Sequence, residues 1–370
     1  MKTALFYCGH PAQYHFAKHT IQLMQNEGWN VLVLIKTKDI LEQLLQEDGV
    51  AYENIQPKFR KNHKIAILWA SFVRTREVYK LAKRYKAEIL IGTDSSIAQA
   101  GWLLRKPTIT TLEDDYDIIK NLAKLTYPFT THIIVPNICK VGRWAYKKIG
   151  YEGYMKLAYL HPHRFTPRKE ILSKYQMQQN DSYVIVRLAK LVAHHDKDVR
   201  GLSLSILKEM ITLCERKGHK VYITSEIVLP NEFLSYQLKI NHTDIHHVLS
   251  QASLLISDSQ SMSVEAAMLG VPSVRYSDFS GRISVLEELE HRYGLTYGIT
   301  TSEPLKLVEK VEDLLSMPNL REEFQKRRQK MLNDKIDVTA FLTWFIENYP
   351  QSAEETKGKK ADDEFWQRFK

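Results

Sequence analysis

Cysteine is scarce in this chain, and long apolar runs are missing. Cys8, Cys139 and Cys214 are odd in number and far apart, so they suggest neither a disulfide framework nor a zinc-binding pattern. No apolar run approaches the roughly 20 residues that a membrane-spanning helix needs. Met1-Lys2 leads directly into a predicted strand, without a signal-peptide pattern. These absences predict a cytoplasmic protein, with a place at the inner face of the membrane left open.

Length and charge narrow the class of protein. A chain of 370 residues is long for one core and sufficient for two domains. Its 52 basic and 43 acidic residues give a net charge of +9, which favours anionic partners such as nucleotide sugars, phospholipid-linked acceptors or nucleic acid. Basic residues between 58 and 86 alternate with aromatic ones. This segment is either the solvated face of a long helix or a surface for peripheral contact with an anionic membrane.

Short apolar segments alternate with amphipathic ones along most of the chain. The pattern predicts right-handed crossovers and two Rossmann-like α/β domains with mostly parallel sheets facing a cleft. We place the first domain at 1–160, a linker at 161–181, the second domain at 182–335, a terminal helix at 336–350 and a loosely held polar tail at 351–370. Within the first domain we expect a helix near Cys139–Ile149 and a last strand around Lys156–Tyr159.

The stretch from Leu254 to Val274 organises the second domain. It is predicted to form a buried strand, a polar turn, a helix closed by Gly270 and a second strand. Turns of this kind lie at the carboxyl edge of a parallel sheet, where a helix amino terminus favours an anion such as phosphate. Ser261 and Glu265 lie one turn apart on the same helix face, so Glu265 can accept hydrogen bonds from ribose hydroxyls. A solvated surface glutamate is the alternative.

The residues of this stretch resemble a known motif. Ser-Asp-Ser-Gln-Ser-Met-Ser-Val-Glu followed by Leu-Gly-Val-Pro is similar to the nucleotide-sugar motif of UDP-N-acetylglucosamine 2-epimerases and related GT-B glycosyltransferases. The resemblance implies that Ser259 contacts phosphate and that Glu265 holds the ribose. Gln260 and Ser261 stand where the epimerases have a Gly-Gly pair.

A second resemblance covers almost the whole chain. The sequence is similar to a prokaryotic family of GT-B-like proteins that is annotated only as a domain of unknown function. The resemblance implies the GT-B architecture, in which the cleft holds donor and acceptor. It also implies that the terminal helix packs back on the first domain.

Three residues of the first domain are candidates for proton transfer. His10 follows the first strand, and similar glycosyltransferases place a histidine in this turn; its alternative role is to cap the turn. Asp94 and Glu113 end two later strands. The resemblance to the epimerases implies acid-base chemistry for this pair, while a helix cap is the alternative role of Asp94.

Basic residues near the predicted carboxyl edge of the second-domain sheet are candidates for binding the diphosphate. Arg187 follows the first strand of that domain, and its guanidinium suits phosphate oxygens. Arg282, in the loop beyond Tyr276, is a candidate for contact with the base or sugar. Other candidates after Arg187 are Lys190, His194, His195 and Asp196. Adjacent histidines point in different directions and no third ligand is evident, so we expect no metal site.

These observations favour a metal-independent GT-B glycosyltransferase that uses a nucleotide-diphosphate sugar, with UDP as the expected nucleotide. The donor is its substrate, and no cofactor is expected. The acceptor would be a lipid-linked or saccharide molecule in cell-surface polysaccharide or glycolipid synthesis, and domain closure would exclude water. The first alternative is a nucleotide-sugar 2-epimerase. A second is a non-catalytic nucleic-acid-binding or scaffold protein, which the second-domain motif disfavours.

Overall fold

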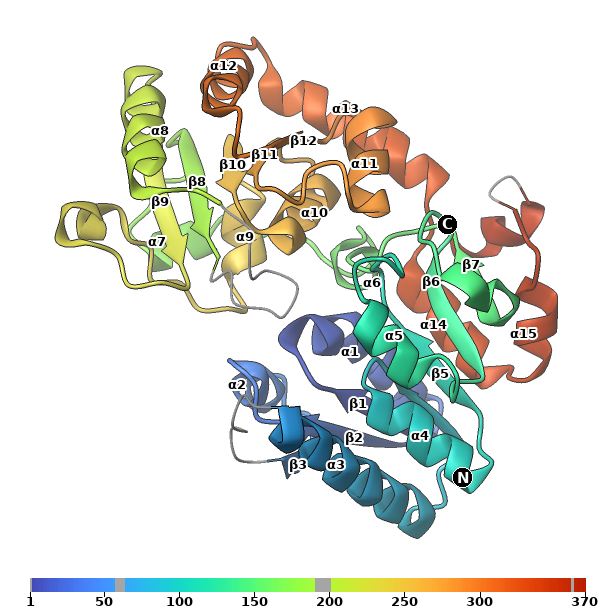
Figure 1. Ribbon diagram of the computed structural model, residues 1–370. Coiled ribbons are helices and arrows are strands. Elements are labelled where there is room, and N and C mark those ends of the chain that lie inside the picture. Colours follow the sequence, from blue (N-terminus) through green and yellow to red (C-terminus); the bar gives the residue numbers. More distant parts are fainter. Residues whose placement is uncertain (1, 57–63, 190–200, 361–362) are drawn as a thin grey trace. The chain divides into compact units, whose positions relative to one another are not determined.

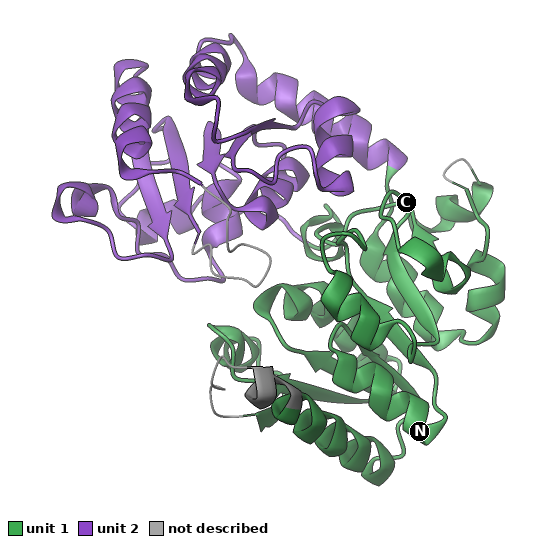
Figure 2. Ribbon diagram, in the orientation of Figure 1, with its two compact units in different colours: residues 1–164, 335–370 green, residues 165–334 purple. Residues whose placement is uncertain are grey.

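The chain divides into two compact units. The computed structural model describes residues 2–56, 64–189, 201–360 and 363–370, without the side chains of 64–68. Unit 1 combines Met1–Arg164 with Lys335–Lys370, and unit 2 is Phe165–Asp334 (Figure 2). The first boundary between the units falls inside the segment predicted as a linker. Part of that segment forms α7 (Ile171–Lys174), which packs against α9 (Ile245–Leu249) within unit 2.

Unit 1 is built on a parallel sheet of seven strands in the order β3-β2-β1-β4-β5-β6-β7. Strand β1, inside this sheet, pairs in parallel with both β2 and β4. The strands are β1 (Thr3–Cys8), β2 (Asn30–Lys36), β3 (Glu53–Gln56), β4 (Ile89–Gly92), β5 (Thr108–Thr111), β6 (His132–Pro136) and β7 (Lys148–Tyr151).

Helices connect the strands of unit 1. Helix α4 packs against both α3 and α5, and α1 packs against α6 and α14 (Figure 1). Helix α14 is the predicted terminal helix, and Phe341 and Phe345 on it are buried. The helices are α1 (Pro11–Asn26), α2 (Leu41–Glu47), α3 (Lys64–Arg84), α4 (Ser95–Leu104), α5 (Lys120–Thr126), η1 (Gly142–Lys147), α6 (Leu157–Leu160), α14 (Val338–Glu347), α15 (Gln351–Thr356) and η3 (Glu364–Phe369).

Unit 2 has a parallel sheet of five strands in the order β12-β11-β10-β8-β9. The strands are β8 (Tyr183–Leu188), β9 (Lys220–Ser225), β10 (Leu254–Ser257), β11 (Ser273–Tyr276) and β12 (Thr296–Ile299). Besides α7 and α9, its helices are α8 (Leu204–Arg216), η2 (Asn231–Tyr236), α10 (Gln260–Leu269), α11 (Ser284–His291), α12 (Pro304–Leu315) and α13 (Leu320–Asp334). Among the described helices of both units, none combines the length and apolarity needed to cross a bilayer.

Parallel pairing brings the ends of the strands to one edge in each sheet. In unit 1, Tyr7 is in register with both Leu34 and Gly92, so the turns after β1, β2 and β4 lie side by side. In unit 2, Ser257 is in register with Arg187 and Arg275. The carboxyl edges therefore carry the predicted site residues of each unit. The predicted α/β class with two Rossmann-like parallel sheets is confirmed.

Two predicted elements of unit 1 are wrong. The segment Lys156–Tyr159 is not a strand, because α6 covers most of it and the Leu160 amide donates to the Lys156 carbonyl at 2.9 Å. Its apolar residues are buried all round, a pattern that fits a short helix as well as a strand. The predicted helix Cys139–Ile149 is instead the short η1 followed by the edge strand β7.

The prediction of a loosely held tail at 351–370 is also wrong. Helix α15 and η3 lie in this segment, and the side chains of Trp366 and Phe369 are buried. Both rings pack edge-on against Phe341 of α14, with ring centroids 5.5 Å away. The apolar area of two aromatic rings outweighs the polar composition around them.

Candidate functional site

The amino terminus of α10 forms the polar turn of unit 2. Ser259 caps the helix, because its Oγ accepts a hydrogen bond from the Met262 amide at 3.4 Å. The Ser259 amide donates to the Ser257 Oγ at 2.8 Å, which fixes the turn after β10. Ser261 is exposed in the first turn. First-turn N–H groups and the helix dipole favour an anion at this end, which is the place predicted for phosphate.

Glu265 lies on α10 one turn after Ser261 and is largely buried, with 12% of its side chain exposed. The sequence offers it no local ion-pair partner, but the structure brings His246 of α9 to it. The His246 Nε2 lies 3.4 Å from the Glu265 Oε2. A carboxylate offers lone-pair sites for about four hydrogen bonds, so contact with His246 is compatible with a ribose diol on the same group.

His246 is a site residue that sequence reasoning missed. It is buried, and the ring of Phe165 meets it edge-on with centroids 6.2 Å apart. Phe165 also stacks on the neighbouring His247 at 4.7 Å, and the Arg168 amide donates to the His247 Nδ1 at 3.2 Å. The adjacent histidines were the available signal, but nothing in their spacing points to Glu265.

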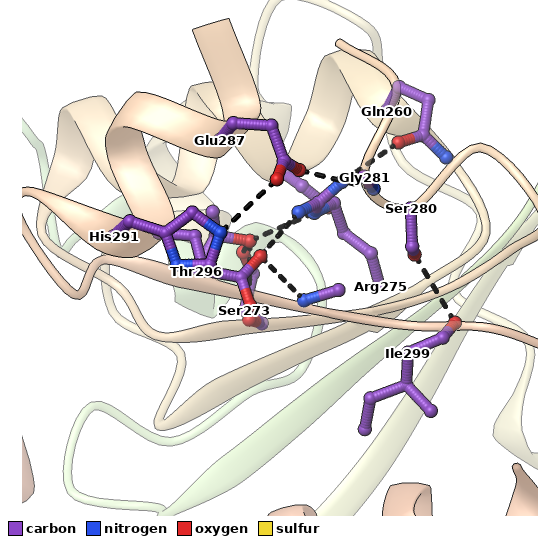
Figure 3. A network of polar contacts seen from close by, with 12 residues as sticks. Gln260, Ser273, Arg275, Ser280, Gly281, Glu287, His291, Thr296 and Ile299 are labelled. Carbon is purple, nitrogen blue, oxygen red and sulfur yellow. Dashed lines mark hydrogen bonds and ion pairs between the residues drawn. The ribbon is translucent and has the colours of Figure 1, made fainter. Parts of the chain in front are cut away.

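A buried arginine holds Gln260, the first residue of α10. Arg275 of β11 is fully buried, and its Nη1 donates to the Gln260 Oε1 at 3.3 Å (Figure 3). Its Nη2 donates to Glu290 at 2.7 Å and its Nε to the Thr296 Oγ1 at 3.3 Å. Burial lowers the pKa of Arg275, against the opposing effect of Glu290 and Glu287. A charged residue inside an apolar strand was the sequence signal for such a network.

The same network fixes the loop after β11. The Glu287 Oε1 accepts a hydrogen bond from the Gly281 amide at 3.1 Å, and the Ser280 Oγ donates to the Ile299 carbonyl at 3.3 Å (Figure 3). Arg282 follows in this loop, where it is exposed and lies over the ring of Phe279 at 5.2 Å. Arg282 is therefore held at the carboxyl edge of the unit 2 sheet.

Arg187 is the next-to-last residue of β8 and is in register with Ser257, just before the Ser259 turn. Its Nη2 forms an ion pair with Glu226. Its Nε is buried and has no hydrogen-bond partner among the described residues. A ligand oxygen that reached this Nε would give a hydrogen-bond acceptor to a donor that has none among the residues the structure describes. Lys190, His194, His195 and Asp196 lie outside the described residues.

Asp258, between β10 and Ser259, is a second residue that sequence reasoning missed. Its Oδ1 accepts a hydrogen bond from the Ala189 amide at 2.7 Å. Burial raises its pKa to about 6, although backbone hydrogen bonds, including those from Ala189 and Leu202, and the charge of Arg187 oppose the rise. The carboxyl group therefore ties the chain after β8 to the α10 turn.

We expect Asp258→Asn to change how the stability of the protein depends on pH. Because the folded-state pKa is raised above the ordinary 3.8, protonation of Asp258 favours the fold, and its contribution is lost as the pH rises through about 4 to 6. Between pH 4 and pH 7 the variant should gain roughly 2–3 kcal/mol relative to wild type. Urea unfolding at both pH values measures this difference. Equal pH dependence in the two proteins would contradict the assignment.

In unit 1, His10 caps α1. Its Nδ1 accepts a hydrogen bond from the Ala12 amide at 3.2 Å, and its Nε2 lies 3.9 Å from Asp39. Partial burial lowers the pKa of His10; Lys38, Lys156 and Lys36 lower it further, while Asp39 opposes them. The ring is therefore neutral at pH 7. Because Nδ1 is the acceptor, the proton lies on Nε2, and His10 must give up its cap bond before Nε2 can accept a proton.

Asp94 caps α4 and is held as a carboxylate. Its Oδ1 accepts hydrogen bonds from the Ser96 amide at 3.0 Å and the Ser96 Oγ at 2.8 Å. Its Oδ2 lies 3.5 Å from Arg74 and 3.9 Å from Lys36. Burial alone would raise the pKa of Asp94, but Arg74, Lys36 and Ser96 outweigh it and lower the pKa. An anion of this kind fits a cap better than a general acid.

Glu113 faces Lys156, a residue absent from the sequence-based candidates. The Glu113 Oε1 lies 3.2 Å from the buried Lys156 Nζ, and its Oε2 accepts a hydrogen bond from the Met155 amide at 2.8 Å. Lys156 also acts on the pKa of His10, and Lys36 acts on both His10 and Asp94. The three predicted residues thus share one edge of unit 1, where Lys36 and Lys156 add positive charge.

One cluster among the described residues has ligand atoms close enough for a metal ion: His161, His163 and Asp337. It does not suit a cation. The Asp337 Oδ2 accepts a hydrogen bond from the Arg164 Nε at 2.8 Å, and the Arg164 Nη2 lies 2.7 Å from the same oxygen. The Asp337 Oδ1 accepts a hydrogen bond from the Ala340 amide at 3.1 Å, so Asp337 also caps α14. A metal ion would have to displace an arginine that already neutralises the carboxylate.

Comparison with solved structures identifies the architecture. A structure described as a putative UDP-N-acetylglucosamine 2-epimerase from Listeria monocytogenes matches with a TM-score of 0.67 and 14% identity over 97% of this chain and 99% of that one. The UDP co-structure of S. aureus MnaA matches with a TM-score of 0.67 and 11% identity over the same shares. Acinetobacter baumannii MurG matches with a TM-score of 0.57 and 16% identity, covering 94% of this chain and 99% of its own. The fold is GT-B.

Searches by sequence give no further match. No protein-family model matches the chain, and no curated protein does. The resemblance to the prokaryotic family of GT-B-like proteins therefore stays a prediction.

Proposed function

We propose that this protein is a metal-independent GT-B glycosyltransferase that takes a nucleotide-diphosphate sugar, with UDP as the nucleotide. One observation carries the proposal: Ser259 caps α10 at the carboxyl edge of the unit 2 sheet, and the largely buried Glu265 follows on the same helix, one turn after Ser261. The helix end suits a diphosphate and the carboxylate suits a ribose diol. A similar fold in S. aureus MnaA has been solved with UDP, which supports the choice of nucleotide.

Unit 2 would hold the donor and stabilise the leaving group. The diphosphate would lie at the α10 amino terminus, with Ser259 and Ser261 beside it and Gln260 held in place by Arg275. The Nε donor of Arg187, which has no hydrogen-bond partner among the described residues, would meet a phosphate oxygen, and Arg282 would approach the base or sugar. These groups are positioned before the donor binds. They therefore stabilise the negative charge that develops on the diphosphate when its bond to the sugar carbon breaks.

Unit 1 would supply the acceptor site and the general base. The acceptor hydroxyl attacks the anomeric carbon while a base removes its proton. Glu113 is a carboxylate beside Lys156, and His10 is neutral at pH 7, so either group can accept this proton. The cap bond of His10 favours Glu113, because His10 must break its contact with Ala12 to use Nε2. The acceptor would belong to cell-surface polysaccharide or glycolipid synthesis.

The epimerase alternative predicts an acid-base role for Asp94, and the variant Asp94→Asn tests it. Asparagine keeps the cap of α4 but removes the charge that faces Arg74. If Asp94 is a cap, catalytic turnover should fall less than about 10-fold, and the main effect should be a loss of roughly 1–2 kcal/mol of stability. Loss of about 100-fold or more in turnover with the fold intact would favour acid-base chemistry. Ser96→Ala, which removes one partner of the same carboxylate, is the matched control.

The donor proposal is tested by calorimetric titration of the whole chain without added metal. The probes are UDP, GDP and their N-acetylhexosamine conjugates. Binding of a uridine nucleotide in preference to a guanosine nucleotide supports the proposal. Lack of binding by every nucleotide, with the protein folded, would overturn it. Steep weakening of all binding with salt would point instead to the nucleic-acid alternative, since phosphate-backbone contacts release counterions.

A further inference from the structure

The outer face of α3 carries a row of exposed aromatic and basic side chains. Trp69 and Phe72 are 67% and 60% exposed, and their rings lie 5.8 Å apart. Arg76, Lys80 and Lys83 continue the row toward the carboxyl end of the helix, and all three are exposed. Successive spacings of three, four, four and three residues keep all five side chains on one side of the helix. We call these five residues the basic-aromatic face.

The rest of the helix explains why this face points outward. Val78 and Ala82 are buried in the unit 1 core with Leu5, Leu34 and Leu90. Large aromatic residues seldom remain so exposed as an adjacent pair, because burial of their apolar area is favourable. Among the described residues, the hydrophobic core of unit 1 is packed without Trp69 and Phe72, and their exposed rings can contact a partner outside it.

The charge of the helix identifies the kind of partner. Apart from the buried Arg74, which pairs with Asp94, the chain from Trp69 to Lys86 has five basic residues and one acidic residue, Glu77. Glu77 lies 3.3 Å from the Arg76 Nη1 and 3.0 Å from the Lys80 Nζ, so it offsets only part of the positive charge. A tryptophan next to a phenylalanine, followed by a basic stripe, matches the interface of a membrane with anionic headgroups.

We propose that the basic-aromatic face binds the surface of a bilayer that contains anionic phospholipid. Trp69 and Phe72 enter the headgroup boundary, and Arg76, Lys80 and Lys83 lie along the negative surface. Each basic residue near such a surface raises affinity about fivefold, and salt weakens this part of the attraction. The proposal does not depend on the donor site of unit 2.

The position of the face bears on the acceptor. Ser71, between the two aromatic residues, has its Oγ 3.5 Å from the Ser95 Oγ at the start of α4. Arg74, one turn further, contacts Asp94. The aromatic end of the face thus adjoins the carboxyl edge of unit 1, which favours a lipid-linked acceptor. This last step rests on the proposed function.

Vesicle binding by the full chain tests the face directly. Vesicles of phosphatidylcholine with phosphatidylglycerol should bind the protein, and vesicles of pure phosphatidylcholine should bind it at least about 10-fold less tightly. Two double variants should each bind the mixed vesicles with about 10-fold or more lower affinity: Trp69→Ser/Phe72→Ser and Arg76→Glu/Lys80→Glu. Calorimetric titration with UDP should be unchanged in both variants, which separates failure of this inference from failure of the donor proposal.

Matched controls use exposed residues on other helices. Trp102→Ser removes a tryptophan that is 58% exposed on α4, and Lys208→Glu/Lys306→Glu reverses two exposed charges in unit 2. Both controls should keep vesicle binding. The inference is overturned if mixed vesicles are not bound, if the controls lose as much as the test variants, or if the test variants keep full affinity. It is also overturned if Trp69→Ser/Phe72→Ser turns a dimer into a monomer, or if single-stranded DNA binds the face more tightly than the vesicles.

Discussion

Replacing Glu265 by alanine should weaken UDP binding at least about 100-fold, the largest effect on ligand affinity that we expect. The carboxylate is positioned to accept two hydrogen bonds from the ribose hydroxyls. Charge-assisted hydrogen bonds are worth roughly 1.5–3 kcal/mol each, and both are lost together in the variant. Calorimetric titration of wild type and variant with UDP measures the change.

Two further variants separate the role of Glu265 from general damage to unit 2. Glu312→Ala removes a surface carboxylate of the same unit that pairs with Lys217 at 3.0 Å, and it should leave UDP affinity unchanged. His246→Gln changes the side chain that contacts the Glu265 Oε2 at 3.4 Å but keeps the carboxylate, so the loss of UDP affinity should be intermediate, near 10-fold. If Glu265→Ala binds UDP as tightly as wild type, the ribose assignment is wrong.

Arg275→Met should lower the unfolding free energy by about 3–5 kcal/mol, the largest expected effect on stability. The guanidinium is fully buried and donates to Gln260, Glu290 and Thr296. Methionine fills a similar space but leaves the Glu290 carboxylate without its charge partner. For a unit of this size the melting temperature should fall by about 10 °C in a calorimetric scan.

The double variant Arg275→Met/Glu290→Met tests the cause of that loss. With both charges removed together, much of the stability should return, because the cost comes from a lone charge and not from lost packing. Arg292→Met is the surface control: its side chain is 49% exposed and pairs with Glu288 and Asp334. It should cost less than about 1 kcal/mol. A double variant less stable than Arg275→Met would show that the packing of Arg275 matters more than its charge.

The fold could be predicted because its sheets are parallel. A strand buried on both faces appears as a continuous apolar run, and each run is followed by an amphipathic helix, so the alternation is visible without an alignment. The errors fall where this rule fails. Strand β12 (Thr-Tyr-Gly-Ile) contains a glycine and has little apolar character, so its sequence does not stand out as a buried strand. The η3 segment has a short aromatic cluster in which Trp366 and Phe369 are buried against Phe341, a contact that local sequence cannot show.

The site could be predicted only as far as one segment extends. Ser259, Ser261 and Glu265 belong to a single strand-turn-helix unit, whose geometry follows from spacing. Their partners come from other elements: His246 from α9 and Arg275 from β11. Those contacts form through tertiary packing, and residue spacing within one segment cannot predict them. The roles of His10 and Asp94 were left open between cap and catalyst, and the structure adds a cap bond for each.

The course of the chain through the two units constrains the order in which the protein folds during synthesis. Unit 2 is one continuous stretch, so it has all its own residues once position 334 has left the ribosome. Unit 1 is discontinuous, and α1 lacks its partner α14 until after that point. Because domains fold as they emerge from the ribosome, unit 1, which is synthesised first, is completed only after unit 2. A nascent chain paused before Val338 would have a foldable unit 2 and a unit 1 that still exposes the surface of α1 to chaperones.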